Sequence, residues 1–489
     1  MLSQNNDKNG STPPKYTRIQ QQSENPFASL IPDQQIAVIP SFTLESGVTL
    51  HNVPLAYTTR GELSPKADNV MVICHALTGS ADVSDWWGPL IGGPGRAFDT
   101  SRFFVVCMNS LGSPYGTASP VTAKDGDPEK GNYGPEFPLT TIRDDVKLHK
   151  LLLDELGVRE VAAVIGGSMG GMLVLEWAYF GKDYVRCIVP IATSSQHSAW
   201  GISWGEAQRQ SIYADPKYED GYYSFSNPPA TGLGAARMAA LLTYRSRNSF
   251  EARFGRNIPD PAKRQTIRER PQPSTPSEAH FQIHNDGHKT TRLSANNSRT
   301  NTPPQASDSG EAAGMSLDPQ FSGPKTGSLT GGDSLPSSTY FSAQSYLRYQ
   351  GEKFVKRFDS NCYIAITRKL DTHDVSRYRA GSIPEALALI EQPTLVLGIE
   401  SDGLFTFAEQ QELAEHIKNA RLEKIDSQEG HDAFLLQFEQ VNRYILEFLN
   451  EILPDIMGKG GEHVEAASVG QLLKSSTFGE AEVEDITAW

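Results

Sequence analysis

The stretch Val161-Ala-Ala-Val-Ile-Gly-Gly-Ser168-Met-Gly-Gly171 decides the fold of this chain. The apolar run Val161–Ile165 reads as a buried strand, and the segment Met172–Phe180 beyond the glycines reads as a helix. The pattern G-x-S-x-G between a strand and a helix is typical of a sharp turn that exposes the serine hydroxyl above a sheet. We therefore expect Ser168 to be a nucleophile, with the N-terminus of the next helix facing developing negative charge.

An acid and a histidine follow Ser168 in the order that such a turn requires. Asp402 comes directly after the apolar run Thr394–Ile399, and His431 follows the next expected strand, Arg421–Ile425. We predict that Asp402 holds His431 in the tautomer that accepts the serine proton. Read singly, Asp402 could be a turn residue and His431 a capping or surface histidine. Their shared order and their positions at strand ends favour the catalytic interpretation.

An oxyanion hole needs two backbone N–H groups, one of them from the residue after the nucleophile. That residue is Met169, and the second donor is expected in the loop His75-Ala-Leu-Thr-Gly79, with Leu77 as the candidate. His75 could itself be a catalytic base, but its position at a strand end before the nucleophile favours a structural role.

The rest of the chain alternates between strand and helix patterns, which indicates an α/β protein with a mostly parallel, doubly wound sheet. Two antiparallel strands are expected first, at Ile36–Phe42 and Leu50–Thr59, and the clearest helix runs from Thr141 to Leu156 with a capping box at its start. With the nucleophile turn, this pattern predicts the α/β-hydrolase fold, with a helical lid inserted after the fifth core strand. The buried runs of the sheet are Val70–His75, Phe103–Met108, Val161–Ile165, Cys187–Ala192 and Thr394–Ile399.

Composition divides the chain into five segments. The fold core is expected at residues 35–194 and 386–455, with the lid at 195–385 between its two parts. Within the lid, residues 255–338 are rich in Ser, Pro, Thr, Gly, Asn and Gln, and such a composition buries too little apolar surface to offset chain entropy. We expect that insert to be disordered, together with the N-terminal residues 1–34 and much of the acidic tail at 456–489.

Charge and cysteine content exclude several classes of function. A net charge of −14 disfavours nucleic acid and anionic membranes as partners. The four cysteines are too few for a disulfide framework, and neither a secretory signal nor a transmembrane segment is evident, so we expect a cytoplasmic protein. His280, His284 and His288 have the spacing of metal ligands, but they lie in the insert beside helix-breaking residues, and we predict no metal site.

Five separated blocks resemble the homoserine O-acetyltransferase family. They are His75-Ala-Leu-Thr-Gly79, Asn109-Ser-Leu-Gly112, Gly166-Gly-Ser-Met-Gly-Gly171, Ser401-Asp-Gly-Leu-Phe405 and Gly430-His-Asp-Ala-Phe434. Shorter blocks agree, among them Ala236-Arg-Met238 and Thr243-Tyr-Arg-Ser246, and Leu111-Gly-Ser-Pro-Tyr-Gly116 looks like the fungal branch. The match extends over roughly Gln35 to Leu453, interrupted by the insert.

The resemblance implies transfer of the acetyl group of acetyl-CoA to the hydroxyl of L-homoserine, a step of methionine biosynthesis, by a ping-pong mechanism without a further cofactor. It implies that Arg237 binds the carboxylate of the acceptor, that Tyr244 lies beside it and that Asp432 binds the ammonium group. A zwitterion in a closed pocket does need one fixed cation and one fixed anion. The alternatives are a surface arginine for Arg237 and a helix cap for Asp432. A homodimer through the lid helices is a further implication.

Two other functions stay open at this point. Transfer to L-serine needs only a small change of pocket, because one methylene in the acceptor is worth about 1–3 kcal/mol of discrimination, and transfer of a succinyl group in place of acetyl is a related alternative. A carboxylesterase would pass the acyl group to water instead.

Overall fold

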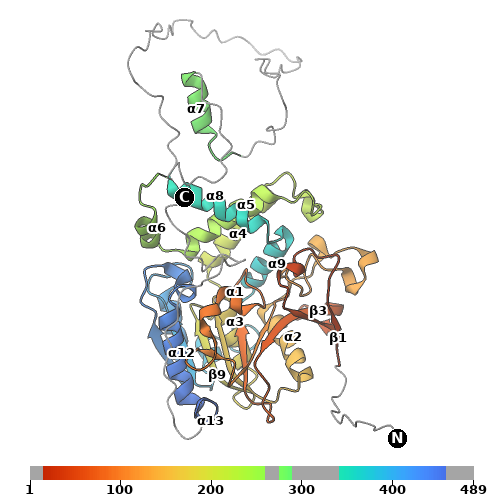
Figure 1. The fold of residues 1–489 in the computed structure, drawn as a ribbon, viewed down its shortest axis with the longest axis vertical. Helices are drawn as coiled ribbons and strands as arrows, with labels where there is room; N and C mark the ends of the chain where they lie inside the picture. Colours follow the sequence, from red (N-terminus) through yellow and green to blue (C-terminus); the bar gives the residue numbers. More distant parts are fainter. Residues whose placement is uncertain (1–14, 259–274, 289–340, 459–489) are drawn as a thin grey trace, which may run out of the picture.

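The computed structural model describes residues 15–258, 275–288 and 341–458. Its centre is a nine-stranded sheet in the order β1-β2-β3-β7-β4-β8-β9-β10-β11. The strands from β7 to β11 run parallel to one another, whereas β1, β2 and β3 form an antiparallel end of the sheet. Figure 1 shows this sheet with helices on both faces and a separate helical layer above it. The predicted mostly parallel, doubly wound sheet is confirmed.

Apart from β1, the strands of the large sheet fall on the predicted runs, within two residues at each end. In chain order they are β1 Thr17–Ile19, β2 Gln35–Thr43, β3 Thr49–Arg60, β4 Val70–Cys74, β7 Phe104–Met108, β8 Val161–Gly167, β9 Val185–Ile191, β10 Thr394–Gly398 and β11 Ala420–Lys424. A separate two-stranded sheet pairs β5 Ile91–Gly92 with β6 Phe98–Asp99.

Both faces of the parallel part of the sheet are buried, which explains why its strands are continuous apolar runs. In β4, Val70 and Val72 belong to one hydrophobic cluster, and Met71 and Ile73 belong to the other. Helices α2 (Ile142–Glu155) and α3 (Met169–Ala178) contribute to the first cluster, while α12 (Phe438–Ile452) contributes to the second. The remaining core helices are α1 Val83–Trp86, α11 Phe407–His416 and α13 Pro454–Met457.

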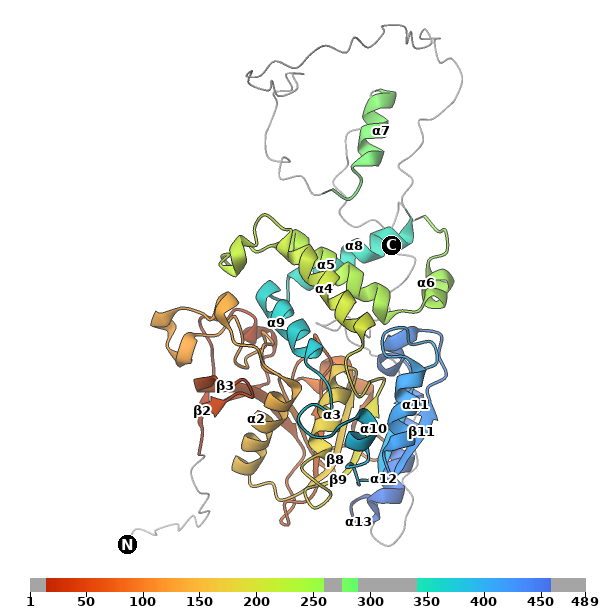
Figure 2. The ribbon, with the colours of Figure 1, turned by 180° about the vertical axis from the view of Figure 1, so that it is seen from behind.

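A helical lid is inserted between β9 and β10. Helix α5 (Ala230–Tyr244) packs between α4 (Ala199–Tyr213) and α8 (Ser342–Val355), and α9 (Ser360–Asp371) packs on α4. The other lid helices are α6 Arg247–Arg253, α7 Pro276–His284 and α10 Ile383–Leu387. Figure 2, seen from behind, also shows the layer of α4, α5 and α8 lying across one end of the core.

Three details differ from the sequence prediction. Residues 15–34 are ordered, because β1 pairs antiparallel with β2 and Arg18 bonds to Glu155. Within the insert predicted to be disordered, Pro276–His284 forms helix α7, which Thr275 caps. The lid follows β9, on the predicted run Cys187–Ala192, but this is the seventh strand of the large sheet in chain order and the fourth of its parallel strands, not the fifth.

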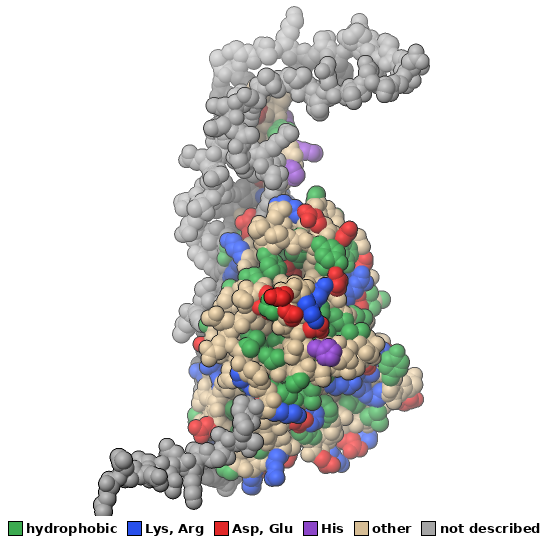
Figure 3. All heavy atoms as spheres, turned by 90° about the vertical axis from the view of Figure 1, so that its right-hand side faces the viewer, with side chains coloured by type: hydrophobic (Ala, Val, Ile, Leu, Met, Phe, Trp, Pro, Cys, Tyr) green, Lys and Arg blue, Asp and Glu red, His purple; other side chains and the backbone are tan. Residues whose placement is uncertain are grey.

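Other observations concern only the described ranges. The four cysteines are buried and free. Within 15–258, 275–288 and 341–458, no three His, Cys, Asp or Glu side chains gather into a group that could hold a metal ion, and no helix is both long and apolar enough to cross a membrane. On the face drawn in Figure 3, acidic and basic side chains are interspersed. The acidic segment from residue 459 onward lies outside the described residues.

Candidate active site

Ser168 stands on a strained turn between β8 and α3. Its φ of 60° and ψ of −124° are unusual for a residue with a side chain. A Cβ atom on Gly170 would lie 2.1 Å from the carbonyl oxygen of Cys74, and one on Gly167 would lie 2.4 Å from the ring of Phe434. The glycines around the serine are therefore required by close packing of the turn against β4 and against the loop that carries the histidine.

The neighbouring strand holds this turn in place. The N–H of Ser168 donates to the carbonyl of Ile191 at 3.0 Å, and the hydroxyl of Thr193 donates to the carbonyl of Ser168 at 2.8 Å. Because Ser168 is the residue directly before the first turn of α3, its hydroxyl lies at the positive end of that helix.

Asp402 and His431 are hydrogen-bonded as the sequence predicted. His431 Nδ1 lies 2.7 Å from Asp402 Oδ2, and both side chains are buried. The other carboxylate oxygen, Oδ1, accepts from the N–H groups of Leu404 and Phe405 at 2.8 and 3.0 Å. These bonds fix the carboxylate in one orientation, so that it can select the tautomer in which Nε2 of His431 is available to accept a proton.

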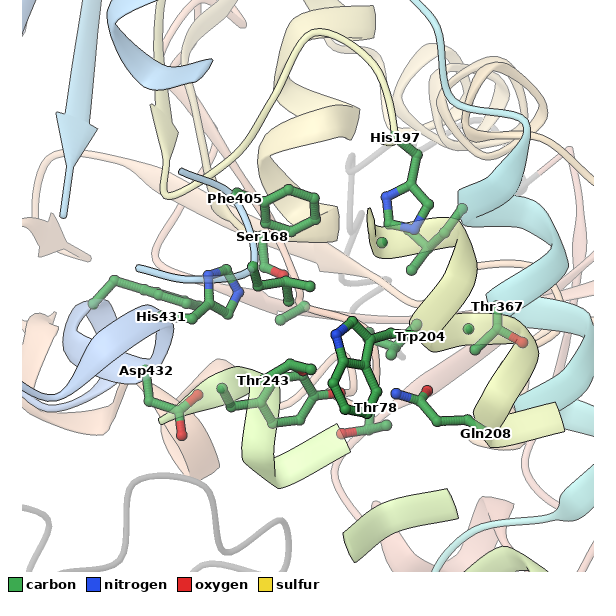
Figure 4. A pocket seen from close by; sticks show the side chains of 18 of the residues that line it. Thr78, Ser168, His197, Trp204, Gln208, Thr243, Thr367, Phe405, His431 and Asp432 are labelled. Carbon is green, nitrogen blue, oxygen red and sulfur yellow. The ribbon is translucent and has the colours of Figure 1, made fainter. Parts of the chain in front are cut away.

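His431 lies on a short 3-10 helix, η8 (Gly430–Leu435), that packs closely against the lid. The φ of Gly430 is +79°, and a Cβ there would lie 2.4 Å from the backbone nitrogen of Ser246. The rings of Phe405 and Phe434 lie 5.3 and 5.6 Å from the imidazole ring, between centres. Figure 4 shows Ser168 and His431 next to each other on one side of a pocket that both residues line.

The loop expected to complete the oxyanion hole is held by His75. Its Nε2 accepts from the N–H of Ser110 at 3.0 Å, so Nδ1 carries the proton and donates to the carbonyl of Ala76 at 2.8 Å. Burial lowers the pKa of His75 to about 4 and keeps the ring neutral. His75 is not among the residues that line the pocket, whereas Leu77 is. This agrees with the structural role favoured for His75.

The predicted substrate-binding residues are only partly brought together. Asp432 and Tyr244 line the pocket with Ser168 and His431, but Arg237 is not on its wall. The guanidinium of Arg237 lies 5.5 Å from the centre of the Tyr244 ring and 4.9 Å from that of Phe354. Arg237 is buried, so the alternative of a surface arginine is wrong.

Sequence reasoning missed a second arginine at the site. Arg245 Nε lies 3.0 Å from Asp432 Oδ2, and Arg245 also pairs with Glu429 at 2.7 Å. The neighbouring carboxylates raise the pKa of Arg245 in spite of burial, which lowers it. The sequence did contain a signal for Arg245, because this residue lies inside the block Thr243-Tyr-Arg-Ser246 that carries the family resemblance.

The sequence also gave no indication that α4 forms a wall of the pocket. Gly201, Trp204, Gly205 and Gln208 of that helix line it, and His197 lies just before them. The pocket has about 680 Å³ of empty volume including its open mouth.

The serine turn, the Asp402–His431 pair and the parallel sheet beneath them define an α/β-hydrolase. A family model described as the alpha/beta hydrolase fold matches residues 69–438, and the chain belongs to that family. A solved structure of esterase E22 shares the fold at a TM-score of 0.63 and 22% identity, covering 85% of this chain and 99% of its own. A homoserine O-acetyltransferase from Bacillus anthracis gives a TM-score of 0.61 at 18% identity, covering 88% and 98%.

Sequence identity narrows this class further than the fold does. The chain is 69% identical to the homoserine O-acetyltransferase of Emericella nidulans, over 97% of this chain and 98% of that protein. Within the α/β-hydrolases it therefore belongs to the homoserine O-acetyltransferase family.

Proposed function

We propose that this protein transfers the acetyl group of acetyl-CoA to the side-chain hydroxyl of L-homoserine. One observation carries the proposal: a serine on a nucleophile turn, a histidine bonded to a buried aspartate and a second carboxylate, Asp432, all border one pocket. The first three groups suit acyl transfer, and the fourth suits an acceptor with an ammonium group. Membership of the homoserine O-acetyltransferase family supports the choice of substrates.

In the first half of the reaction, Ser168 Oγ attacks the thioester carbonyl carbon while Nε2 of His431 takes the hydroxyl proton. The backbone N–H groups of Met169 and Leu77 stabilise the negative charge on the carbonyl oxygen. The C–S bond then breaks, and His431 gives its proton to the departing sulfur of CoA. Asp402 stabilises the imidazolium ring in the interval. The product of this half is an acetyl ester on Ser168.

In the second half, the hydroxyl of homoserine replaces CoA. His431 takes the proton of that hydroxyl, the oxygen attacks the acetyl carbon, and Ser168 leaves with the proton from His431. Water must be kept out of the pocket at this stage, because it would attack the same ester. The lid helix α4 and the loop of Phe405 border the pocket and supply much of its apolar cover.

For acceptor binding, Asp432 is assigned to the ammonium group and Arg237 to the carboxylate, with Tyr244 beside the arginine. Arg237 is stacked on Tyr244 rather than placed on the pocket wall, so this assignment requires the Tyr244 ring to turn aside when homoserine enters. We further propose a cytoplasmic enzyme of methionine biosynthesis that forms homodimers through its lid. Exposed apolar side chains on α4 and α5, Trp200 and Leu242, support that interface.

The test is CoA release, followed by thiol titration, with L-homoserine, L-serine or water as acceptor and with acetyl-CoA or succinyl-CoA as donor. Release that requires acetyl-CoA and homoserine supports the proposal. Preference for serine or succinyl-CoA would change the substrate and keep the mechanism, and release with water alone would make the protein a hydrolase. Ser168→Ala should abolish turnover, while the exposed Ser29→Ala should leave it unchanged.

A further inference from the structure

The pocket is chemically different at its two ends. Asp432 is the one Asp, Glu, Lys or Arg among the described residues that line it. In Figure 4, Asp432 lies on the same side as His431, whereas Trp204, Gln208 and Thr367 lie toward the other side. The far end therefore presents neutral polar groups, and its ligand should be neutral at the point of contact, because an uncompensated charge is costly to bury.

Trp204 brings a hydrogen-bond donor to this neutral end. Its indole Nε1 is buried and has no hydrogen-bond partner among the described residues. The ring is held by Trp200, which packs edge-on against it at 5.7 Å between centres. Trp200 in turn donates its own N–H to the carbonyl of Gly403, beside Asp402, at 3.1 Å. The Trp204 N–H is thus a buried donor without a partner in the described part of the chain, and a ligand acceptor would satisfy it.

Gln208 supplies a second donor one helical turn further along α4. Its side chain is 6% exposed, and its Oε1 accepts from the hydroxyl of Tyr363 at 2.8 Å. With its oxygen bonded to Tyr363, the amide directs its NH₂ group away from that hydroxyl. Figure 4 shows that nitrogen pointing toward Trp204.

The two donors lie on one face of α4, because residues four apart on a helix are neighbours. Gly201 and Gly205 belong to the same face and add no side chain to it. The pocket therefore has two neutral N–H donors at the end away from Asp432, next to a face of α4 where the two glycines leave the backbone uncovered. Neutral donors suit carbonyl oxygens of amides better than carboxylates or phosphates, which attract charged partners.

We infer that Trp204 Nε1 and Gln208 Nε2 bind the amide carbonyls of the pantetheine arm of the acyl donor. This rests on the proposed function, since it names the donor's binding site within the same pocket. The arm would lie along the α4 face and deliver its thioester to Ser168, while the acceptor enters at the Asp432 end. Selection of a CoA thioester over a simple acetyl ester would then depend on these two side chains.

The test separates the two halves of the ping-pong reaction. Trp204→Phe and Gln208→Met should each lower kcat/KM for acetyl-CoA by about 3- to 10-fold, the worth of one hydrogen bond. The kcat/KM for homoserine and the acylation rate with p-nitrophenyl acetate, which lacks a pantetheine arm, should change less than about twofold. Gln210→Met, exposed on the same helix, is the matched control and should change none of these. The p-nitrophenol burst counts active sites and corrects for any misfolded fraction.

A donor series on the unaltered enzyme gives an independent measurement. S-acetylpantetheine should keep most of the kcat/KM of acetyl-CoA, and S-ethyl thioacetate, which has no amide, should lose about 10- to 100-fold beyond any difference in intrinsic reactivity. Equal rates for these two thioesters, or equal losses with p-nitrophenyl acetate in the variants, would overturn the inference. Failure of homoserine to accept the acetyl group would overturn the proposed function alone. The donor series would still test the inference, because it measures the rate of the first half-reaction, in which Ser168 is acetylated.

Discussion

Asp432, the residue after His431, is paired with Arg245 at the C-terminal end of α5, with 3.0 Å between Asp432 Oδ2 and Arg245 Nε. The pair joins the lid to the loop that carries the histidine, and both side chains are buried. It fixes the carboxylate that we assign to the ammonium group of the acceptor. Acceptor recognition and lid position are therefore linked through one ion pair.

Arg245→Met should damage the second half-reaction more than the first. Loss of the guanidinium releases the Asp432 carboxylate from its position, and a misplacement of about 1 Å can cost 10²-fold. We expect kcat/KM for homoserine to fall about 10- to 100-fold, with acylation by acetyl-CoA within a few-fold of the starting value. Steady-state kinetics with each substrate varied in turn measures both. Arg253→Met removes a partner of Glu429 only and should leave both values within about twofold.

The sequence predicted those parts of the site that depend on local motifs. Thr141 and Asp144 form the expected capping box of α2, and Ser168, Asp402 and His431 occupy the expected strand ends. The Arg245–Asp432 pair was not predicted, because it depends on how the lid docks on the core. The pocket wall formed by α4 was not predicted for the same reason, since it also depends on how the lid packs on the core. Neither contact follows from local spacing alone, although Arg245 itself lies in a block that carries the family resemblance.

Two errors in the prediction of the fold, the missed strand β1 and the missed helix α7, have a different cause. Strand β1 has three residues, too few to show alternation, and it exists because it pairs with β2. Helix α7 has local signals, with Thr275 at the N-cap, Pro276 at the first helical position and Glu278 in the first turn. The composition of residues 255–338 nevertheless predicts disorder, because it averages over the whole segment and does not detect a single capped helix.

Asp402→Asn should lower kcat about 10⁴-fold without unfolding the protein. Asparagine can still accept from the backbone N–H groups of Leu404 and Phe405, so the loop should keep its shape. Its amide cannot stabilise an imidazolium as a carboxylate does, and it can hold His431 in the wrong tautomer. Single-turnover acetylation of Ser168, followed by intact-protein mass spectrometry, measures the loss. An unchanged acetylation rate would remove Asp402 from the mechanism.

Lys369→Met should destabilise the fold by about 3–5 kcal/mol, because it leaves the Asp145 carboxylate fully buried without its ammonium partner. Lys369 Nζ of α9 lies 2.5 Å from Asp145 Oδ2 of α2, and both side chains have no exposed area. Asp145 also accepts from the N–H of Leu111. Urea denaturation followed by tryptophan fluorescence gives the free energy of unfolding.

The double variant Asp145→Leu with Lys369→Met should recover part of that loss, since it removes both charges together. Lys150→Met on α2 removes the exposed pair with Asp154 and the contacts of the ammonium group with the Phe180 and Tyr184 rings, and should cost less than about 2 kcal/mol. A single Lys369 variant no less stable than this control would show that the buried pair contributes nothing net.

Stability should fall as the pH drops below about 6.5, and His75 should be one cause. Burial lowers its pKa from 6.5 to about 4, so the unfolded chain binds a proton at that site between these pH values while the folded protein does not. Protonation therefore favours unfolding across this window, and the contribution of His75 is complete above it. Between pH 7 and pH 5 the loss should be about 2 kcal/mol for this group.

The effect of His75 can be isolated by comparing how two substitutions change the pH dependence of unfolding. His75→Gln should flatten the fall in unfolding free energy between pH 7 and pH 5 by about 2 kcal/mol, whatever it does to stability at pH 7. His51→Gln changes an exposed ring and serves as the matched control. His149, whose pKa burial lowers to about 3, should keep part of the acid sensitivity in the His75 variant. If the curve for His75→Gln runs parallel to that of the unaltered protein, His75 is not a source of the acid sensitivity.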